Sequence, residues 1–172
     1  MFDKSYSFKY KNYRKYKEGQ TDVIEHSLTF FDKFNEKYIV RVEEYLEVNV
    51  FVVKFYLARH KDKENYYQAL TKLNNPSKVI NTIIEIMIDF YRKNPTASFG
   101  FIGINSENES TANTKRYRLY KKLMENFFPE NKFLHYPFTS KSAYLMLNRN
   151  NASQEMLEKI EDFFNNIYIL GA

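Results

Sequence analysis

The sequence has no cysteine and no tryptophan, and it has only four glycines and four prolines in 172 residues. The absence of cysteine excludes disulfides, thiol nucleophiles, iron–sulfur clusters and every zinc site that needs thiolate ligands. The three histidines are isolated from one another, so histidine clusters give no support to a metal site either. We expect a protein of the reducing cytoplasm that holds no metal.

Long apolar runs are also missing. The most apolar stretches, VINTIIEIMIDF and VNVFVVKFYLA, carry charges and are too short to span a bilayer. The opening letters, MFDKSYSFKYKNYRKYK, contain no apolar core of the kind found in signal peptides. The sequence therefore predicts no contact with a membrane.

Aromatic residues are abundant, with 15 tyrosines and 16 phenylalanines, and 44% of the residues are hydrophobic. This supply suffices for one core, so we expect residues 1–172 to form a single domain. Basic residues number 26 and acidic residues 21, a formal net charge of +5. The mild basic excess fits contact with nucleic acid or another polyanion. The richness in Asn, Lys and Tyr resembles that of small protein families from AT-rich bacteria.

Alternating residues predict four strands in the first third of the chain. Tyr6, Phe8 and Tyr10 share one face of an extended segment, whereas the lysines between and after them share the other. The run at 48–58 is apolar on both faces and is expected to be the central strand. The four predicted strands cover residues 6–16, 24–31, 38–45 and 48–58, and the second and third form a hairpin.

Helical spacing of apolar residues follows in three segments, at about 76–93, 114–128 and 153–168. Pro76 after Asn75 suits the start of the first helix, and Ser153 suits the cap of the last. Further strands are predicted at 97–104, 132–138 and 142–147. The expected fold class is α+β: a single mixed, mostly antiparallel sheet of about seven strands, meander first, with helices on its faces.

The helix at 114–128 contains the cationic letters NTKRYRLYKKL. A helical wheel places Lys115, Arg118 and Lys122 on one side, which indicates an ordinary solvated face. Opposite them runs an apolar stripe that is expected to face the sheet. That stripe consists of Tyr117, Tyr120, Leu123, Met124 and Phe127.

The start of this helix is the candidate binding site. Asn113, Thr114 and Arg116 stand where free backbone N–H groups and the positive end of the helix dipole favour an anion. Lys115 is a further contributor. In the alternative interpretation, Asn113 or Thr111 only caps the helix, and Arg116 pairs with an acidic residue of the preceding loop.

The letters FGFIGI…NTKRYRLYKKL resemble the late strand and following helix of the GNAT superfamily of N-acetyltransferases, whose motif there runs N-x-x-A-x-x-L-Y-x-K-x-G-F. Asn113, Leu119, Tyr120 and Lys122 match this motif. The order of elements over residues 24–147 is also similar to the GNAT core. The resemblance implies acetyl-CoA as cofactor, with Asn113 as a cofactor contact and Tyr120 as the general acid to the departing thiolate.

A basic and aromatic segment, YSFKYKNYRKYK, lies near the N-terminus. Platforms for single-stranded nucleic acid combine exposed rings with cations on the same face. The early alternation separates Tyr6, Phe8 and Tyr10 from Lys9 and Lys11, which favours an ordinary amphipathic strand. The later letters YRKYK break the alternation and are the better candidate for a basic surface.

The remaining titratable residues are given ordinary interpretations. His26 and His135 fall within predicted strands and are interpreted as core or edge histidines. Glu43 and Glu44 are neighbours in sequence and are interpreted as solvated.

Three functions remain open. The first is a non-catalytic binding or interaction domain that contacts a protein or polyanion through residues 113–118. The second is a divergent acyl-CoA-dependent N-acyltransferase, and the third is a nucleic-acid-binding module. The first is favoured over the second because TKLNNPSKVINT stands where GNAT proteins have a glycine-rich pyrophosphate loop, and close approach of a backbone to phosphate requires glycine.

Overall fold

The computed structural model describes residues 4–60, 76–102, 115–138, 143–151, 153–164 and 166. Its strands are β1 (Phe8–Glu18), β2 (Thr21–Phe31), β3 (Lys37–Tyr45), β4 (Val50–Leu57), β5 (Ser98–Ile102), β6 (Phe133–Phe138) and β7 (Ala143–Asn148). Its helices are α1 (Pro76–Lys93), α2 (Lys115–Phe127) and α3 (Gln154–Phe164). Short 3-10 turns cover Ala58–His60 and Arg149–Asn151.

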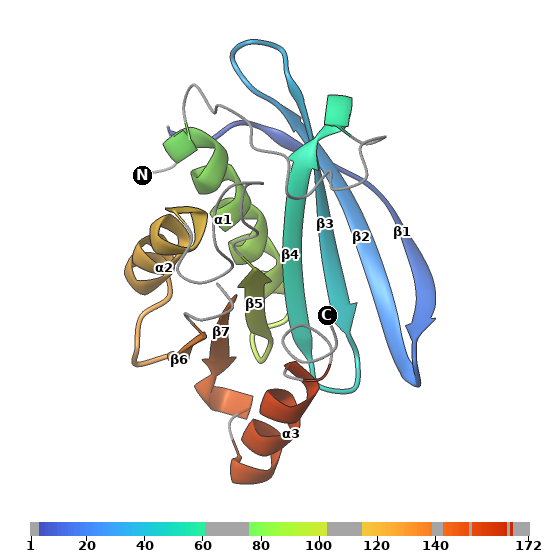
Figure 1. Cartoon of the computed structure of the whole chain (residues 1–172), viewed down its shortest axis with the longest axis vertical. Helices are drawn as coiled ribbons and strands as arrows, with labels where there is room; N and C mark the ends of the chain where they lie inside the picture. Colours follow the sequence, from blue (N-terminus) through green and yellow to red (C-terminus); the bar gives the residue numbers. More distant parts are fainter. Residues whose placement is uncertain are drawn as a thin grey trace.

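The described strands form one sheet in the order β1-β2-β3-β4-β5-β7-β6 (Figure 1). The pair β4–β5 is parallel, with α1 in the connection, and the other pairs are antiparallel. The predicted fold class, α+β with one mixed, mostly antiparallel sheet that begins as a meander, is confirmed. β4 is the central strand, as predicted.

The element boundaries agree closely with those expected from sequence. α1 covers residues 76–93 as predicted, and it starts with Pro76. α2 and α3 start one residue later than predicted, and α3 ends at Phe164. The predicted Ser153 cap is confirmed, because its Oγ accepts the backbone N–H of Met156 at 3.1 Å. The predicted Asn75 cap lies outside the described residues.

Three tight turns hold the meander together. Gly19, between β1 and β2, has a φ of 64°, which glycine adopts without a Cβ clash. Asn35 and Asn49 have φ values of 61° and 53° in the next two turns, where asparagine is the tolerated alternative. In the β2–β3 turn, Asp32 Oδ1 accepts the backbone N–H groups of Phe34 and Glu36, each at 2.9 Å.

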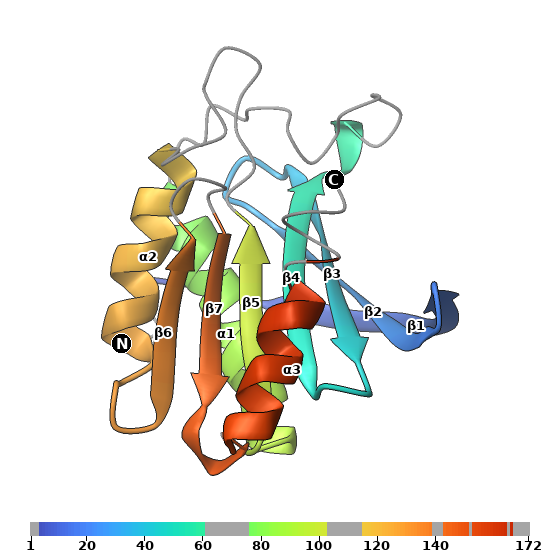
Figure 2. The same ribbon diagram turned by 60° about the horizontal axis from the view of Figure 1, so that its bottom comes forward.

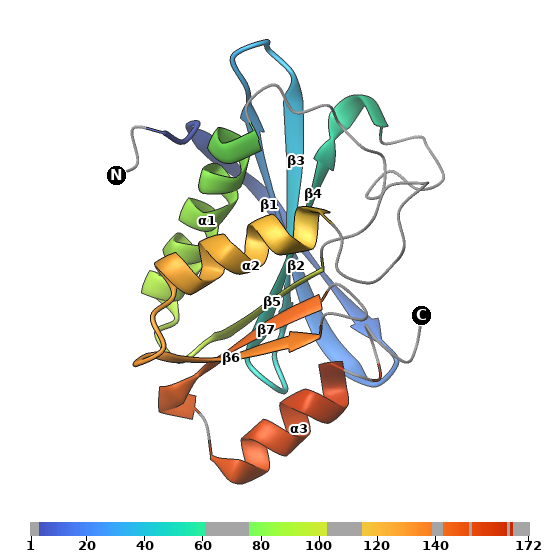
Figure 3. The same cartoon turned by 60° about the vertical axis from the view of Figure 1, so that its left-hand side comes forward.

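The helices cover opposite faces of the sheet, as Figures 2 and 3 show. On the face that we call the α1–α2 face, Ile84, Met87 and Met124 pack with Val40 and Phe99 in the larger core. On the α3 face, Ile160 packs with residues of β3, β4 and β7 in the smaller core. The far end of β1 and the facing start of β2 extend beyond the helices, on the right of Figure 1. None of the helices within the described ranges is both long and apolar enough to cross a membrane.

Candidate functional site

A β-bulge in β1 changes which side chains share a face of that strand. Tyr10 lies opposite Leu28 of β2, but the register then shifts at Lys11, and Asn12 lies opposite Ser27. Directly opposite residues of an antiparallel pair have their side chains on the same face. One extra residue in β1 therefore resets the alternation for the remainder of the strand.

Beyond the bulge, the side chains of Tyr13, Lys15 and Lys17 lie on the α1–α2 face together with that of Tyr10. Tyr10 and Tyr13 are 50% and 59% exposed, and both lysines are exposed as well. Two accessible rings and two cations thus share one face of the edge strand. We call this surface the platform, and define it as Tyr10, Tyr13, Lys15 and Lys17.

His26 lies beside the two platform rings. Its Nδ1 is 2.9 Å from the Tyr10 hydroxyl, and its Nε2 is 2.8 Å from Oε2 of Glu44. When the neutral ring donates its Nε2–H to the Glu44 carboxylate, Nδ1 accepts a hydrogen bond from the Tyr10 hydroxyl. The ring centroids of Tyr10 and Tyr13 lie 5.9 and 6.4 Å from that of His26, and Phe90 of α1 packs edge-on against it at 5.0 Å. Tyr10 is therefore held by a hydrogen bond, and both platform rings contact the His26 ring.

The charge state of Tyr10 suits an anionic ligand. Burial raises the pKa of Tyr10 above its ordinary value, with further contributions from Tyr13 and Glu44 that outweigh the opposite effect of Lys93. The side chain is therefore a neutral phenol at neutral pH. It presents a ring face to a ligand without repelling negative charge.

A hollow of about 440 Å³ continues the platform toward the β1–β2 turn. Lys15 and Lys17 line both the platform and the hollow, and Asp22, Ile24 and Leu46 contribute to its walls together with Tyr16 and Val23, which belong to the α3 face of the same strands. Leu46 belongs to the β3–β4 turn and is half exposed. Its backbone N–H donates to the Asp22 carbonyl at 3.4 Å, which ties that turn to β2.

Positive charge is concentrated on β1. The strand contains five basic residues and one acidic residue, against a net charge of +5 for the whole chain. Within the described part of the chain Lys15 forms no ion pair. Lys17 lies 3.8 Å from Asp22, and both side chains are largely exposed. An exposed pair at that distance contributes little to stability and leaves both charges accessible.

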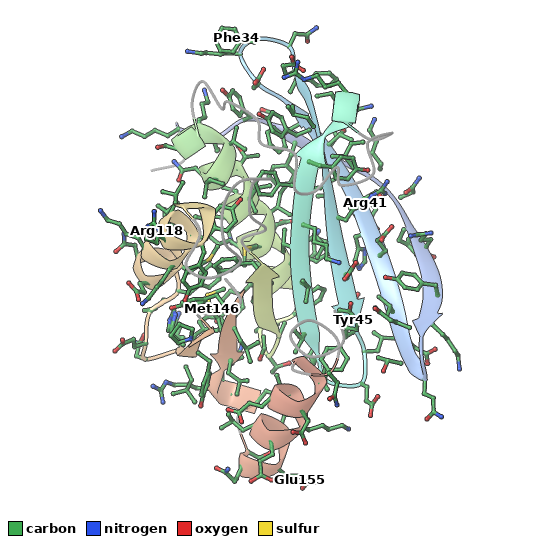
Figure 4. All side chains as sticks on the ribbon, in the orientation of Figure 1. Phe34, Arg41, Tyr45, Arg118, Met146 and Glu155 are labelled. Carbon is green, nitrogen blue, oxygen red and sulfur yellow. The ribbon has the colours of Figure 1, made fainter. Side chains whose placement is uncertain are left out.

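The α3 face of the same strands carries a second set of charges, which we call the network: Arg14, Glu25, Arg41, Glu43 and Lys54. Glu25 and Glu43 lie directly opposite each other on β2 and β3, yet only 7% and 6% of their surface is exposed. Arg14 donates to both oxygens of Glu25, at 2.9 and 3.3 Å, and Lys54 donates to Glu43 at 2.9 Å. The cations offset the repulsion that two opposed carboxylates would otherwise cause. Arg41, labelled in Figure 4, lies 3.9 Å from Glu25.

The interpretation of Glu43 and Glu44 as solvated side chains is wrong. Glu43 is buried and also accepts a hydrogen bond from Tyr45 at 2.8 Å, and Glu44 binds His26. The two residues lie on opposite faces because strand neighbours alternate. Their charged partners, Lys54 for Glu43 and His26 for Glu44, come from neighbouring strands, which the local sequence does not indicate.

His135 has a structural role, in agreement with its interpretation from sequence as a core or edge histidine. Its Nδ1 lies 2.7 Å from the Tyr144 hydroxyl, and its Nε2 lies 2.7 Å from the carbonyl oxygen of Phe128. A carbonyl only accepts, so Nε2 carries the proton and Nδ1 accepts from Tyr144. His26, also predicted to be a core or edge histidine, lies within β2, where Tyr10 and the Glu44 carboxylate are its partners.

The site predicted at the start of α2 is only partly covered by the structure. Asn113 and Thr114 lie outside the described residues. Arg116 belongs to the first turn of α2, but its side chain is not among those described. Their proposed contact with an anion or cofactor stays a prediction.

The rest of α2 agrees with its helical wheel. Tyr117, Tyr120 and Met124 are buried against the sheet, whereas Arg118 and Lys122 are exposed. Figure 4 shows Arg118 on the outer side of the helix. The Tyr120 ring lies 6.2 Å from Phe55 of β4 and 5.1 Å from Phe101 of β5. Its hydroxyl is buried.

Metal ligands do not gather anywhere in the described ranges, where no group of three or more His, Asp or Glu side chains is placed to hold an ion. Comparison of the chain with known protein families, curated proteins and solved structures finds no match.

Proposed function

We propose that this chain is a non-catalytic binding domain whose ligand is a single-stranded nucleic acid, held on the platform of β1. The observation that carries the proposal is the bulge at Lys11, which brings Tyr10 and Tyr13 to the same face as Lys15 and Lys17. Exposed rings stack on unpaired bases, and lysines beside them neutralise the phosphates between those bases. A cytoplasmic location in a bacterium belongs to the same proposal.

The preference for a single strand over a duplex follows from the rings. Bases in a duplex are stacked on one another and offer no free face to a side chain in an open sheet. The bases of a single strand can be spread over an aromatic surface, with about 1–3 kcal/mol gained for each base that stacks. Tyr10 and Tyr13 are exposed enough to accept bases in this way.

The proposal differs from the sequence-based expectation in where the ligand binds. The helix start at residues 113–116 was expected to attract a polyanion, but its key side chains lie outside the described set. The platform is supported by described contacts, since His26 and Glu44 hold Tyr10 in place. An additional contact at the start of α2 is compatible with the platform and stays a prediction.

Binding of a fluorescein-labelled oligothymidylate of about 15 nucleotides, followed by anisotropy, tests the proposal. We expect binding at low salt that weakens steeply as salt is added, because lysines displace counterions from phosphate. Tyr13→Ala is expected to reduce affinity about tenfold through the loss of one stacked base. Phe34→Ala is the matched control, since Phe34 is equally exposed, at 55%, but lies at the tip of the β2–β3 turn (Figure 4).

Two results would overturn the proposal. One is the absence of measurable binding at low salt. The other is equal loss of affinity in the Tyr13→Ala and Phe34→Ala variants, which would show that the exposed ring on β1 is not the contact.

A second candidate, a divergent acyl-CoA-dependent N-acyltransferase, is supported by the position of Tyr120. This residue lies against Phe55 and Phe101, on the two strands of the one parallel pair in the described sheet, and it lines a cavity of about 10 Å³ there. The resemblance to GNAT proteins implies that Tyr120 protonates the departing thiolate of coenzyme A.

Thermal denaturation with acetyl-CoA separates this candidate from the first. A ligand at 100 times its Kd stabilises the fold by about 2.7 kcal/mol, or roughly 5–10 °C for a chain of this size. No shift at millimolar acetyl-CoA would exclude the transferase. If a shift occurs, Tyr120→Phe should retain it and reduce acyl transfer.

A further inference from the structure

We infer that the hollow beside the platform is a guanine-selective pocket, in which the Asp22 carboxylate binds the Watson–Crick edge of one base. This inference rests on the proposed function, because the base is presented as part of a strand that is bound on the platform. It adds sequence preference to a surface whose stacking contacts alone would not distinguish one base from another.

The size and walls of the hollow suit one nucleobase. Its volume of about 440 Å³ lies in the range of pockets that bind small organic groups. Ile24 and Leu46 supply apolar surface for the flat faces of a base. Asp22 is the carboxylate among the lining residues, so it can meet the polar edge of a base that enters between these walls.

The chemistry of Asp22 selects guanine. An ionised carboxylate only accepts hydrogen bonds, through two oxygens side by side. Guanine presents two adjacent donors on its Watson–Crick edge, N1–H and the N2 amino group. Adenine and cytosine present one amino donor beside an acceptor, and thymine presents one N–H between two carbonyl oxygens. Only guanine can therefore satisfy both oxygens of Asp22 at once.

The Asp22 carboxylate remains accessible for such a contact. Its side chain is 64% exposed, and its ion-pair partner, the Lys17 ammonium, lies 3.8 Å away, beyond direct hydrogen-bond distance. Lys15 and Lys17 line the same hollow and are suited to the phosphates that flank the base. A strand that stacks on Tyr13 reaches the hollow along the same face of β1, since Lys15 follows two residues later.

The test compares two labelled strands of equal length by anisotropy: oligothymidylate, and the same strand with one central guanine. We expect the guanine-containing strand to bind the wild-type protein about tenfold more tightly, as for a bidentate base contact. In Asp22→Asn the ratio of the two affinities should fall to about one, while binding of oligothymidylate is retained. Asp162→Asn is the matched control, because it removes an equal charge from an exposed position on α3 and should leave the ratio unchanged.

The possible outcomes separate this inference from the proposed function. Equal binding of both strands to the wild-type protein would overturn the guanine pocket and leave the platform intact. A guanine preference that persists in Asp22→Asn would overturn the assignment to Asp22. Failure of both strands to bind would overturn the pocket together with the proposed function.

Discussion

The two faces of β1 use similar side chains for opposite purposes. On the α3 face, Arg14 donates two hydrogen bonds to the buried carboxylate of Glu25. On the α1–α2 face, the next residue, Lys15, is exposed and forms no ion pair with any described residue. Strand β1 thus supplies one cation to the network and another cation to the platform.

The difference lies in what the neighbouring strand places opposite each residue. β2 and β3 present glutamates to the network face, and these carboxylates fix the cations by hydrogen bonds at 2.9 Å. On the platform face, β2 presents His26 and Ile24, which bind no lysine, and Asp22, which lies 3.8 Å from Lys17 in an exposed pair that leaves both charges accessible. Cations that are hydrogen-bonded to buried carboxylates contribute to stability, whereas exposed cations that are unpaired or only loosely paired are available to a ligand. The network should therefore determine folding, and the platform should determine binding.

The largest expected effect is on stability and comes from Glu43→Ala on the network face. The change removes a carboxylate from Lys54 at 2.9 Å and a hydrogen-bond acceptor from Tyr45 at 2.8 Å. Breaking a buried ion pair from one side costs about 3 kcal/mol, or roughly 9 °C in Tm for a chain of this size. Urea and thermal denaturation measure both quantities.

Glu130→Ala is the control for that change, because Glu130 is exposed and lies near the opposite edge of the sheet. It should alter the free energy of unfolding by less than about 0.5 kcal/mol. If both variants proved equally stable, the network would not have the structural importance assigned to it.

A second prediction concerns alkaline pH. Burial, reinforced by Glu43, Glu25 and Glu18, raises the pKa of Tyr16 on the network face well above 10. An acid whose pKa is raised by folding stabilises the native state only while it is protonated, so stability is complete below pH 10 and falls as the pH rises further. Burial also raises the pKa values of Tyr38 and Tyr144.

Urea denaturation between pH 8 and pH 11 should therefore show a falling free energy of unfolding above pH 10. Tyr16→Phe should lessen this fall, because phenylalanine has no proton to lose. A fall of equal size in Tyr16→Phe and in the wild-type protein would contradict the network environment described for this tyrosine.

The smallest expected effect distinguishes the roles of two adjacent cations, Lys15 and Arg14, in binding. Lys15→Ala should weaken oligothymidylate binding and lower the slope of log affinity against log salt by about 0.7, the value for one lysine on a single strand. Arg14→Ala should leave the slope nearly unchanged, because Arg14 lies on the network face and binds Glu25. Equal slopes for the two variants would remove the distinction between the faces.

Much of the fold could be predicted from sequence because it depends on local periodicity. The apolar spacing after Pro76 predicted α1 over its whole length, and the apolar run around Val52 identified β4 as the central strand. The stripe of α2 that includes Tyr117 and Tyr120 was likewise predicted to face the sheet, and both residues are buried. Such patterns report which side of an element is covered, whatever covers it.

The candidate site was harder to predict because it depends on pairing between strands. Alternation assigned Tyr10 to the correct face of β1. The letters after Tyr10 gave no indication that Lys11 would occupy a bulge, because a bulge exists only relative to the register of β2. The loss of alternation in YRKYK was the available signal. The opposition of Glu25 and Glu43 also requires the register of β2 and β3, since the two residues are 18 positions apart in sequence.

The most direct test of the central claim is to locate the bound strand. Ultraviolet cross-linking of oligothymidylate to the wild-type protein, followed by digestion and mass spectrometry, identifies the side chains that touch bases. We expect cross-links on Tyr10 or Tyr13 that disappear when unlabelled strand is added in excess. Cross-links confined to other parts of the chain, such as α2, would contradict the assignment of the binding surface to the platform of β1.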